Sequence, residues 1–175
     1  MDKDILRKAF LDKRNKLNKE EIKSKSNIIK EKLFSSKEYK KAKSVCVYVS
    51  FNSEVFTHDM IKEALKTKEV SVPVVKKDIL ILSKIDSFKD LDKKNKYGNL
   101  EPSKIKEIKK VDLIIVPAII FDKKRYRIGY GKGYYDRLLK KIKAKTIGLT
   151  FSSQIIEKIP IDDFDVKVGK VISDK

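Results

Sequence analysis

The sequence predicts an α/β fold of three layers (α/β/α), with helices on both faces of a mainly parallel central sheet. Apolar runs typical of strands alternate with stretches of helical periodicity, as in proteins built from β–α–β units. Residues 113–121 form the longest apolar run, which is typical of a buried strand. No internal repeat or linker divides residues 1–175, so we expect a single domain.

The chain is expected to begin with two helices. Residues 2–17 place apolar side chains on one face, beside a basic stripe. Asn18 and Glu21 have the spacing of a capping box, in which each side chain bonds the backbone N–H of the other residue. The second helix should therefore start there and run to about residue 35.

Strands and helices alternate through the rest of the chain. We expect strands at residues 44–50, 70–75, 79–82, 113–117 and 146–150 and near Val171, and helices at residues 57–66 and from 134 to about 143. Residues 86–110 are rich in lysine and weakly periodic, which indicates a long surface loop with one short helix. Ligands of parallel sheets bind beyond the carboxyl ends of the strands. The loops after Val49, Pro117 and Thr150 should therefore form one functional rim.

The chain carries a strong positive charge, with a formal net charge of +18 at pH 7. Of its 43 basic residues 38 are lysines, scattered as on a solvated surface. The five arginines are grouped: Arg7 and Arg14 lie in the first helix, and Arg125, Arg127 and Arg137 surround a glycine-rich segment. The use of arginine around the glycine-rich segment indicates a site that grips phosphate or carboxylate through the planar guanidinium group.

Neither a disulfide nor a zinc site is expected. The only cysteine, Cys46, lies in an apolar strand pattern, and the only histidine, His58, has no partner at ligand spacing. The sequence shows no signal peptide and no apolar run of the ~20 residues that a membrane span needs. We therefore expect a cytoplasmic protein that does not enter a membrane.

Three alternating glycines, Gly129, Gly131 and Gly133, follow the apolar run, and a helical pattern begins at Tyr134. A glycine-rich loop between a late strand and a helix forms a pocket for an anion, because its backbone N–H groups can approach phosphate oxygens. A dinucleotide fingerprint would need glycine in place of Tyr134, and a P-loop would need Ser or Thr in place of Gly133. We therefore expect a phosphate loop of another kind, with a plain tight turn as the alternative.

The residues around this glycine loop suit phosphoryl transfer. Backbone amides would hold triphosphate oxygens, while Lys132 and Arg127 would neutralise the charge that develops. Asp136 lies one turn inside the helix, where a carboxylate either holds Mg²⁺ or complements the helix dipole. Asp165 is a second candidate metal ligand, with an acidic surface turn as the alternative.

A flat heterocycle is the second ligand that the sequence suggests. Glu54 follows a strand that is expected to be buried, and its carboxylate could accept two N–H bonds from a pterin or a guanine. Tyr134 and Tyr135 could pack against a ring system or be half-buried as ordinary packing residues.

The segment RIGYGKGYYDR at residues 127–137 closely resembles the signature of the 5-formyltetrahydrofolate cyclo-ligase family, also called 5,10-methenyltetrahydrofolate synthetases. Weaker matches in the same order extend the resemblance along the chain. They lie at residues 3–7, 54–57, 98–102, 116–122, 154, 160 and 165–168. The family commonly has Asp at the position of Gly169, so Asp165 is the C-terminal acidic candidate that remains.

The resemblance implies an ATP- and Mg²⁺-dependent ligase that forms a C–N bond in a reduced folate. The formyl oxygen of 5-formyltetrahydrofolate takes the γ-phosphoryl group of ATP and gives an iminophosphate. N10 then attacks that carbon, and phosphate leaves as 5,10-methenyltetrahydrofolate forms. An amide oxygen is a poor nucleophile, so the enzyme's task is alignment and charge stabilisation.

The resemblance also implies nucleotide contacts for individual residues. These residues are Lys3, Arg7, Arg127, Gly129, Tyr130, Gly131, Lys132, Gly133, Tyr134 and Tyr135. Among them, Lys132, Arg127 and Tyr134 would lie near the transferred group and are the catalytic candidates.

The same resemblance assigns the folate and the metal. Glu54 would grip the pterin edge, with Val49 and Tyr135 on the substrate wall. Asp136 and Asp165 would hold Mg²⁺.

Two other functions stay open at this point: an ATP-using paralogue that acts on another N-formyl or amide compound, and a basic RNA-binding module. The net charge and segments such as Lys104–Lys110 motivate the RNA-binding module, but no aromatic–basic nucleic-acid signature accompanies them. We therefore expect a monomer whose partners are ATP and a reduced folate, with no specific nucleic acid.

Overall fold

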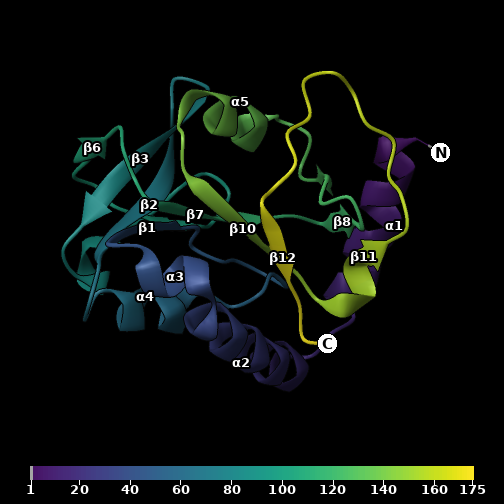
Figure 1. Cartoon of the computed structure of the whole chain (residues 1–175), viewed down its shortest axis with the longest axis horizontal. Helices are drawn as coiled ribbons and strands as arrows, with labels where there is room; N and C mark the ends of the chain where they lie inside the picture. Colours follow the sequence, from purple (N-terminus) through teal and green to yellow (C-terminus); the bar gives the residue numbers. More distant parts are fainter. Residues whose placement is uncertain (1) are drawn as a thin grey trace.

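A seven-stranded sheet forms the centre of the computed structural model, which describes residues 2–175 (Figure 1). Its strand order is β12-β10-β7-β1-β2-β3-β6. The strands are β1 (Ser44–Val47), β2 (Glu69–Lys76), β3 (Ile79–Ile85), β6 (Glu107–Ile108), β7 (Leu113–Pro117), β10 (Lys145–Leu149) and β12 (Lys170–Ile172). The five strands from β12 to β2 pair in parallel, and only β3 and β6 add antiparallel pairs.

Helices cover both faces of this sheet, which confirms the predicted three-layer arrangement. In Figure 1, α2, α3 and α4 lie below the sheet, α5 lies above it, and α1 stands beside it. The helices are α1 (Lys3–Asn15), α2 (Lys19–Ser35), α3 (Lys37–Lys41), α4 (His58–Ala64) and α5 (Tyr134–Lys141), with short 3₁₀ helices η1 (Phe88–Asp90) and η2 (Ser152–Gln154). The predicted capping box of Asn18 and Glu21 is present at the start of α2.

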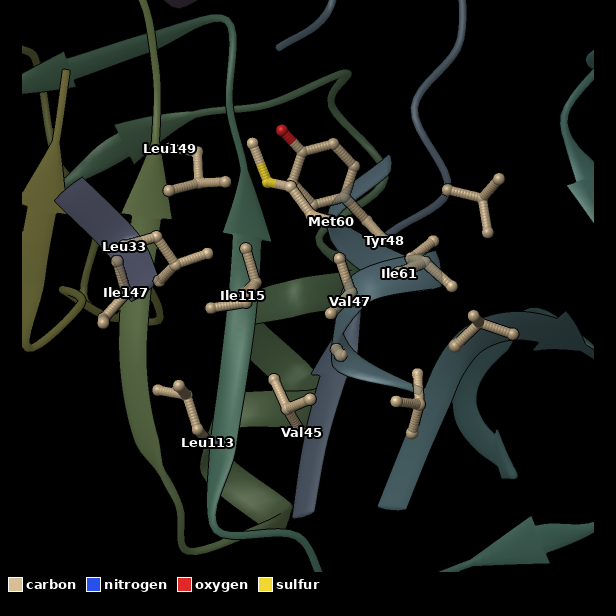
Figure 2. Packing of buried hydrophobic residues seen from close by; sticks show 14 of the residues in the cluster. Leu33, Val45, Val47, Tyr48, Met60, Ile61, Leu113, Ile115, Ile147 and Leu149 are labelled. Atoms are coloured by element: carbon tan, nitrogen blue, oxygen red, sulfur yellow. The ribbon is translucent and has the colours of Figure 1, made fainter. Parts of the chain in front are cut away.

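The alternation of side chains along the strands separates two apolar cores. Figure 2 shows Val47 of β1 and Ile115 of β7 on the face that packs against Leu33 of α2 and Met60 of α4. Residues next along the strands point to the opposite face, as the two-residue period of a strand requires. These residues, Cys46, Ile114 and Val116, pack with Leu138 of α5.

The glycine loop lies between a late strand and a helix, but that strand is not the central strand that the apolar run at residues 113–121 predicts. Pro117 ends β7, and a separate hairpin of β8 (Ile120–Asp122) and β9 (Arg127–Ile128) comes before the loop. The chain reverses because Asp122 accepts the N–H groups of Arg125 and Tyr126, with Arg125 in the left-handed region at φ 71°. This hairpin pairs with β11 (Ile155–Ile156) in a small second sheet on which α1 packs.

Residues 86–110 hold more regular structure than the predicted surface loop with one short helix. The short helix is present as η1, but β4 (Lys93–Lys94) and β5 (Leu100–Glu101) form a hairpin and β6 extends the main sheet. Two-residue strands leave too little periodicity for a sequence pattern to reveal. In residues 2–175 no helix is long and apolar enough to cross a membrane.

The predicted rim at the carboxyl ends of the parallel strands is confirmed by hydrogen bonds between its loops. Arg14 of α1 donates to Ser53 Oγ after β1, at 3.1 Å, and to the carbonyl of Ala118 after β7, at 3.3 Å. Gln154, after β10, donates to the carbonyl of Ile119 at 2.6 Å. The loops that follow three neighbouring strands therefore meet at one place.

Candidate functional site

The glycine loop joins β9 to α5 in a conformation that glycine favours. Gly131 and Gly133 have φ angles of 93° and 65°, in the left-handed region that other residues adopt with strain. The Arg7 guanidinium packs on the loop: its Nε donates to the carbonyl of Gly129 at 2.7 Å, and a Cβ at Gly131 would lie 3.4 Å from it. Asp4 is the ion-pair partner of Arg7 on α1.

Two pockets border the loop, and Lys132 and Arg137 line both. The larger one, of about 370 Å³, is completed by Gly131, Gly133, Asp136, Lys140 and Phe164. The other one, of about 280 Å³, is completed by Asp78, Lys96, Tyr97 and Tyr134. Lys132 is exposed, so its ammonium group is available to an anion bound in the loop.

Arg127 and Asp136 form a mostly buried ion pair beside the larger pocket, which Asp136 lines. Arg127 Nη2 lies 3.0 Å from Asp136 Oδ1, and the side chains are 5% and 19% exposed. Asp136 Oδ1 also accepts the N–H of Val166 at 2.9 Å, and Arg127 Nη1 donates to the carbonyl of Val166 at 2.7 Å. Arg127 therefore orients Asp136 and the segment between β11 and β12, in addition to bringing positive charge to the loop.

Asp165 lies in the same segment and is paired with the N-terminal helix. Lys3 Nζ lies 2.5 Å from Asp165 Oδ2 and 2.6 Å from Asp162 Oδ2. Partial burial lowers the pKa of Lys3, but the two carboxylates raise it by more than burial lowers it, so the net shift of the pKa is upward. Lys3 also lies 5.9 Å from the centre of the Phe164 ring, which borders the larger pocket.

The carboxylates that were predicted as metal ligands therefore lie around Arg127, but their surroundings differ. Asp136 lines the larger pocket, whereas Asp165 is 8% exposed and is matched by Lys3. Within residues 2–175 no group of three or more metal-ligating side chains is found. Such a site fits Mg²⁺ only in the form in which one or two carboxylates share the ion with phosphates and water.

Glu54 lies at the same rim, after β1, and it is 6% exposed. Its Oε2 accepts the N–H of Phe51 at 3.1 Å, and its Oε1 accepts the hydroxyl of Tyr130 at 3.3 Å. Burial raises the pKa of Glu54 to about 7, while Arg14 and these hydrogen bonds act in the opposite direction. The predicted pterin residue is thus a buried carboxyl group beside the glycine loop.

Tyr130 and Arg14 join Glu54 in one network. Arg14 is 3% exposed, and its Nη2 donates to the Tyr130 hydroxyl at 2.7 Å. Burial and the nearby Glu54 raise the pKa of Tyr130 to about 12, so its hydroxyl stays a donor. Sequence reasoning gave Arg14 no role in the site. The grouping of the few arginines in this lysine-rich chain was the signal that could have found it.

The other predicted contact residues occupy different environments. Tyr134 lines the smaller pocket, and the Arg137 guanidinium lies 5.3 Å from the centre of its ring. Tyr135 packs against the core under α5, and burial raises its pKa well above the usual value. Val49 is 6% exposed and belongs to the core below the sheet. Of these three residues, only Tyr134 is brought to a pocket beside the loop.

Comparison with protein families gives a match over almost the whole chain. A family model described as the 5-formyltetrahydrofolate cyclo-ligase family matches residues 1–174. A probable 5-formyltetrahydrofolate cyclo-ligase of Caenorhabditis elegans is 32% identical over 90% of this chain and 85% of its own length. The 5-formyltetrahydrofolate cyclo-ligase of Mycoplasma pneumoniae is 31% identical, with complete coverage of both chains.

Solved structures extend the similarity to three dimensions. The NMR structure of Aquifex aeolicus 5,10-methenyltetrahydrofolate synthetase matches with a TM-score of 0.90 at 37% identity, over 100% of this chain and 91% of that one. The 5,10-methenyltetrahydrofolate synthetase of Mycoplasma pneumoniae matches with a TM-score of 0.81 at 28% identity, over the full length of both. The central, mostly parallel sheet is common to these proteins.

Proposed function

The chain belongs to the 5-formyltetrahydrofolate cyclo-ligase family, and we propose that it closes 5-formyltetrahydrofolate to 5,10-methenyltetrahydrofolate at the expense of ATP, with Mg²⁺ bound beside the phosphates. Membership makes the chain a ligase of folate metabolism. Our proposal adds three points to this: which residues bind ATP, that Mg²⁺ is bound, and that the reaction passes through a phosphorylated intermediate.

The observation that carries the proposal is the gathering of cationic side chains from separate segments at the glycine loop. Arg7 comes from α1, Arg127 from β9 and Lys132 from the loop itself. Glycine at positions 131 and 133 lets the backbone approach a ligand, and the N-terminus of α5 faces the same pocket. A triphosphate suits this arrangement of positive charge and backbone donors.

In the proposed reaction the protein aligns two substrates and stabilises charge. The formyl oxygen bonds to the γ-phosphorus while the bond from that phosphorus to the β–γ bridging oxygen breaks, and ADP leaves. N10 then bonds to the formyl carbon, the carbon–oxygen bond breaks, and the phosphate departs with the former formyl oxygen and takes up the proton that N10 loses. Lys132 would neutralise the charge on the moving phosphoryl group, and Tyr134, Arg7 and Lys3 would hold the nucleotide.

Magnesium would be held by Asp136, with the nucleotide phosphates and water completing its shell. Bound there, the ion would neutralise phosphate charge. Arg127 would keep Asp136 pointed at the larger pocket. Asp165 would coordinate the ion only if it gave up its ion pair with Lys3, so we propose Asp136 as the main ligand and Asp165 as the weaker one.

Glu54 would bind the pterin edge from the neighbouring loop. The Gly loop and Glu54 approach each other through Tyr130, so both substrates would meet at this rim. Replacing Glu54 with glutamine is expected to weaken binding of 5-formyltetrahydrofolate more than binding of ATP, because a neutral amide offers one acceptor oxygen in place of two. Equal effects on the Kd values of both ligands would contradict the pterin role.

The direct test is the ATP- and Mg²⁺-dependent appearance of the methenyl chromophore when the protein is mixed with 5-formyltetrahydrofolate. We expect product, with one ADP formed per ring closed. ATP turnover that responds to a different N-formyl compound, without methenyl product from the folate, would instead identify a paralogue with another substrate. Absence of both activities in folded protein would refute the proposal.

A further inference from the structure

Two buried side chains, Arg14 and Glu54, are joined through the hydroxyl of Tyr130, a residue that is 45% exposed, in a continuous chain of hydrogen bonds between segments that are distant in sequence. Arg14 of α1 donates to the Tyr130 hydroxyl at 2.7 Å, and that hydroxyl donates to Glu54 Oε1 at 3.3 Å. Arg14 is itself fixed by Ser53 Oγ and by the carbonyl of Ala118. The network therefore ties the first helix, the loop after β1 and the glycine loop to one another.

Tyr130 links the two proposed substrate sites, because it belongs to the glycine loop and its hydroxyl contacts Glu54, the carboxylate proposed to bind the pterin. It lies between Gly129, whose carbonyl holds Arg7, and Gly131, which packs on the same guanidinium. Its ring also lies 5.8 Å from the ring of Phe51, whose N–H bonds Glu54. A shift of the loop would therefore reach Glu54 through both the hydroxyl and the ring of Tyr130.

The hydrogen bonds on Glu54 orient the carboxylate without saturating it. A carboxylate has about four lone-pair positions. Tyr130 takes one on Oε1 and Phe51 takes one on Oε2, the only such bonds found within residues 2–175. One position on each oxygen stays available, which matches two N–H donors on the edge of a flat heterocycle. Tyr130 thus holds Glu54 in a conformation that can still receive such a ligand.

We propose that Tyr130, held by Arg14, is a positioning residue that fixes Glu54 for the pterin and thereby makes nucleotide and folate bind cooperatively. The proposal rests on the proposed function, since it names how the two substrate sites communicate. A nucleotide in the glycine loop orders Tyr130, and Tyr130 orders Glu54. The folate then binds a carboxylate that is already oriented, and by thermodynamic linkage it strengthens nucleotide binding by the same factor.

The first experiment measures the Kd of 5-formyltetrahydrofolate by calorimetry, with and without a non-hydrolysable ATP analogue and Mg²⁺. The ratio of the two values is the coupling factor. One net hydrogen bond corresponds to about a fivefold change in binding, so we expect the analogue to tighten folate binding roughly fivefold. Tyr130→Phe keeps the ring on Phe51 and removes only the hydroxyl, and its coupling factor should fall towards one.

Tyr126→Phe is the matched control. Tyr126 is a partly buried tyrosine of the neighbouring β8–β9 hairpin, and we assign it no contact with either ligand. Its coupling factor should equal that of the native chain. Native coupling of one, an unchanged factor in Tyr130→Phe, or an equal loss in Tyr126→Phe would each overturn the proposal.

A second experiment needs no folate and so separates this proposal from the proposed function. The Kd of the ATP analogue is measured for Tyr130→Phe, Glu54→Gln and the double variant, with folding checked by thermal melting. If the hydroxyl and the carboxylate act as a pair, each single change weakens nucleotide binding and the double change weakens it no further. Additive effects of the two changes would overturn the link between Tyr130 and Glu54, even if the chain binds the folate. If the chain binds no folate, the proposed function is refuted, but the effects of the two changes on nucleotide binding still decide whether Tyr130 and Glu54 are linked.

Discussion

Replacing Glu54 with glutamine is expected to remove a loss of stability that the native chain suffers as the pH rises. Glu54 is 6% exposed, and burial raises its pKa from 4.5 to about 7. Between these two values the folded chain holds a proton on Glu54 that the unfolded chain has released. The folded state binds more protons there, so its free energy of unfolding falls with increasing pH.

The size of this effect follows from the shift of the pKa. Each pKa unit corresponds to ~1.4 kcal/mol, so the change from 4.5 to about 7 predicts a loss of about 3 kcal/mol of stability. The loss is absent below pH 4.5, where Glu54 is protonated in both states. It is complete once the pH has passed about 7, where Glu54 is ionised in both states.

Urea unfolding of the native chain and of Glu54→Gln at a series of pH values from 4 to ~8.5 measures this effect. Glutamine has the same shape and no proton to release, so subtracting the two curves removes the contributions of every other titrating group. A constant offset from altered hydrogen bonds does not matter, because only the slope of the difference reports the proton. Parallel curves would show that Glu54 is not titrating in this range and would refute the reasoning.

The remaining predictions concern the phosphate loop, the metal and the core. Lys132→Ala should lower kcat roughly 100-fold or more while the fold survives, because it removes a positive charge that stabilises the moving phosphoryl group. The control Lys124→Ala changes another exposed lysine and should keep a kcat near the native value. Full activity of Lys132→Ala would contradict the role of Lys132. Asp136→Asn should abolish turnover at Mg²⁺ concentrations that saturate the native chain, and an unchanged Mg²⁺ titration would remove Asp136 as a ligand. Gly148→Ala should cost about 1–3 kcal/mol in urea unfolding, since its Cβ would overlap the buried Phe121 ring; an unchanged midpoint would contradict that packing.

Local patterns were sufficient for most of the elements. The side-chain spacing of a capping box located the start of α2, since the two bonds that Asn18 and Glu21 exchange are local. The apolar run at 113–117 became β7 with the same boundaries, because a strand buried on both faces needs apolar residues at every position. The hairpin of β8 and β9 was missed because β8 begins inside what resembles one continuous apolar run, and β9 has only two residues.

By itself, then, the sequence determined the layered α/β fold, the glycine loop and the residue types that surround it. The tertiary structure alone decided which of those residues meet: Arg127 with Asp136, Lys3 with Asp165, and Glu54 with Tyr130. Periodicity and short motifs act over a few residues, whereas these partners lie up to 162 positions apart. Their pairing depends on the register of strands and on the burial of charge, which no local pattern encodes.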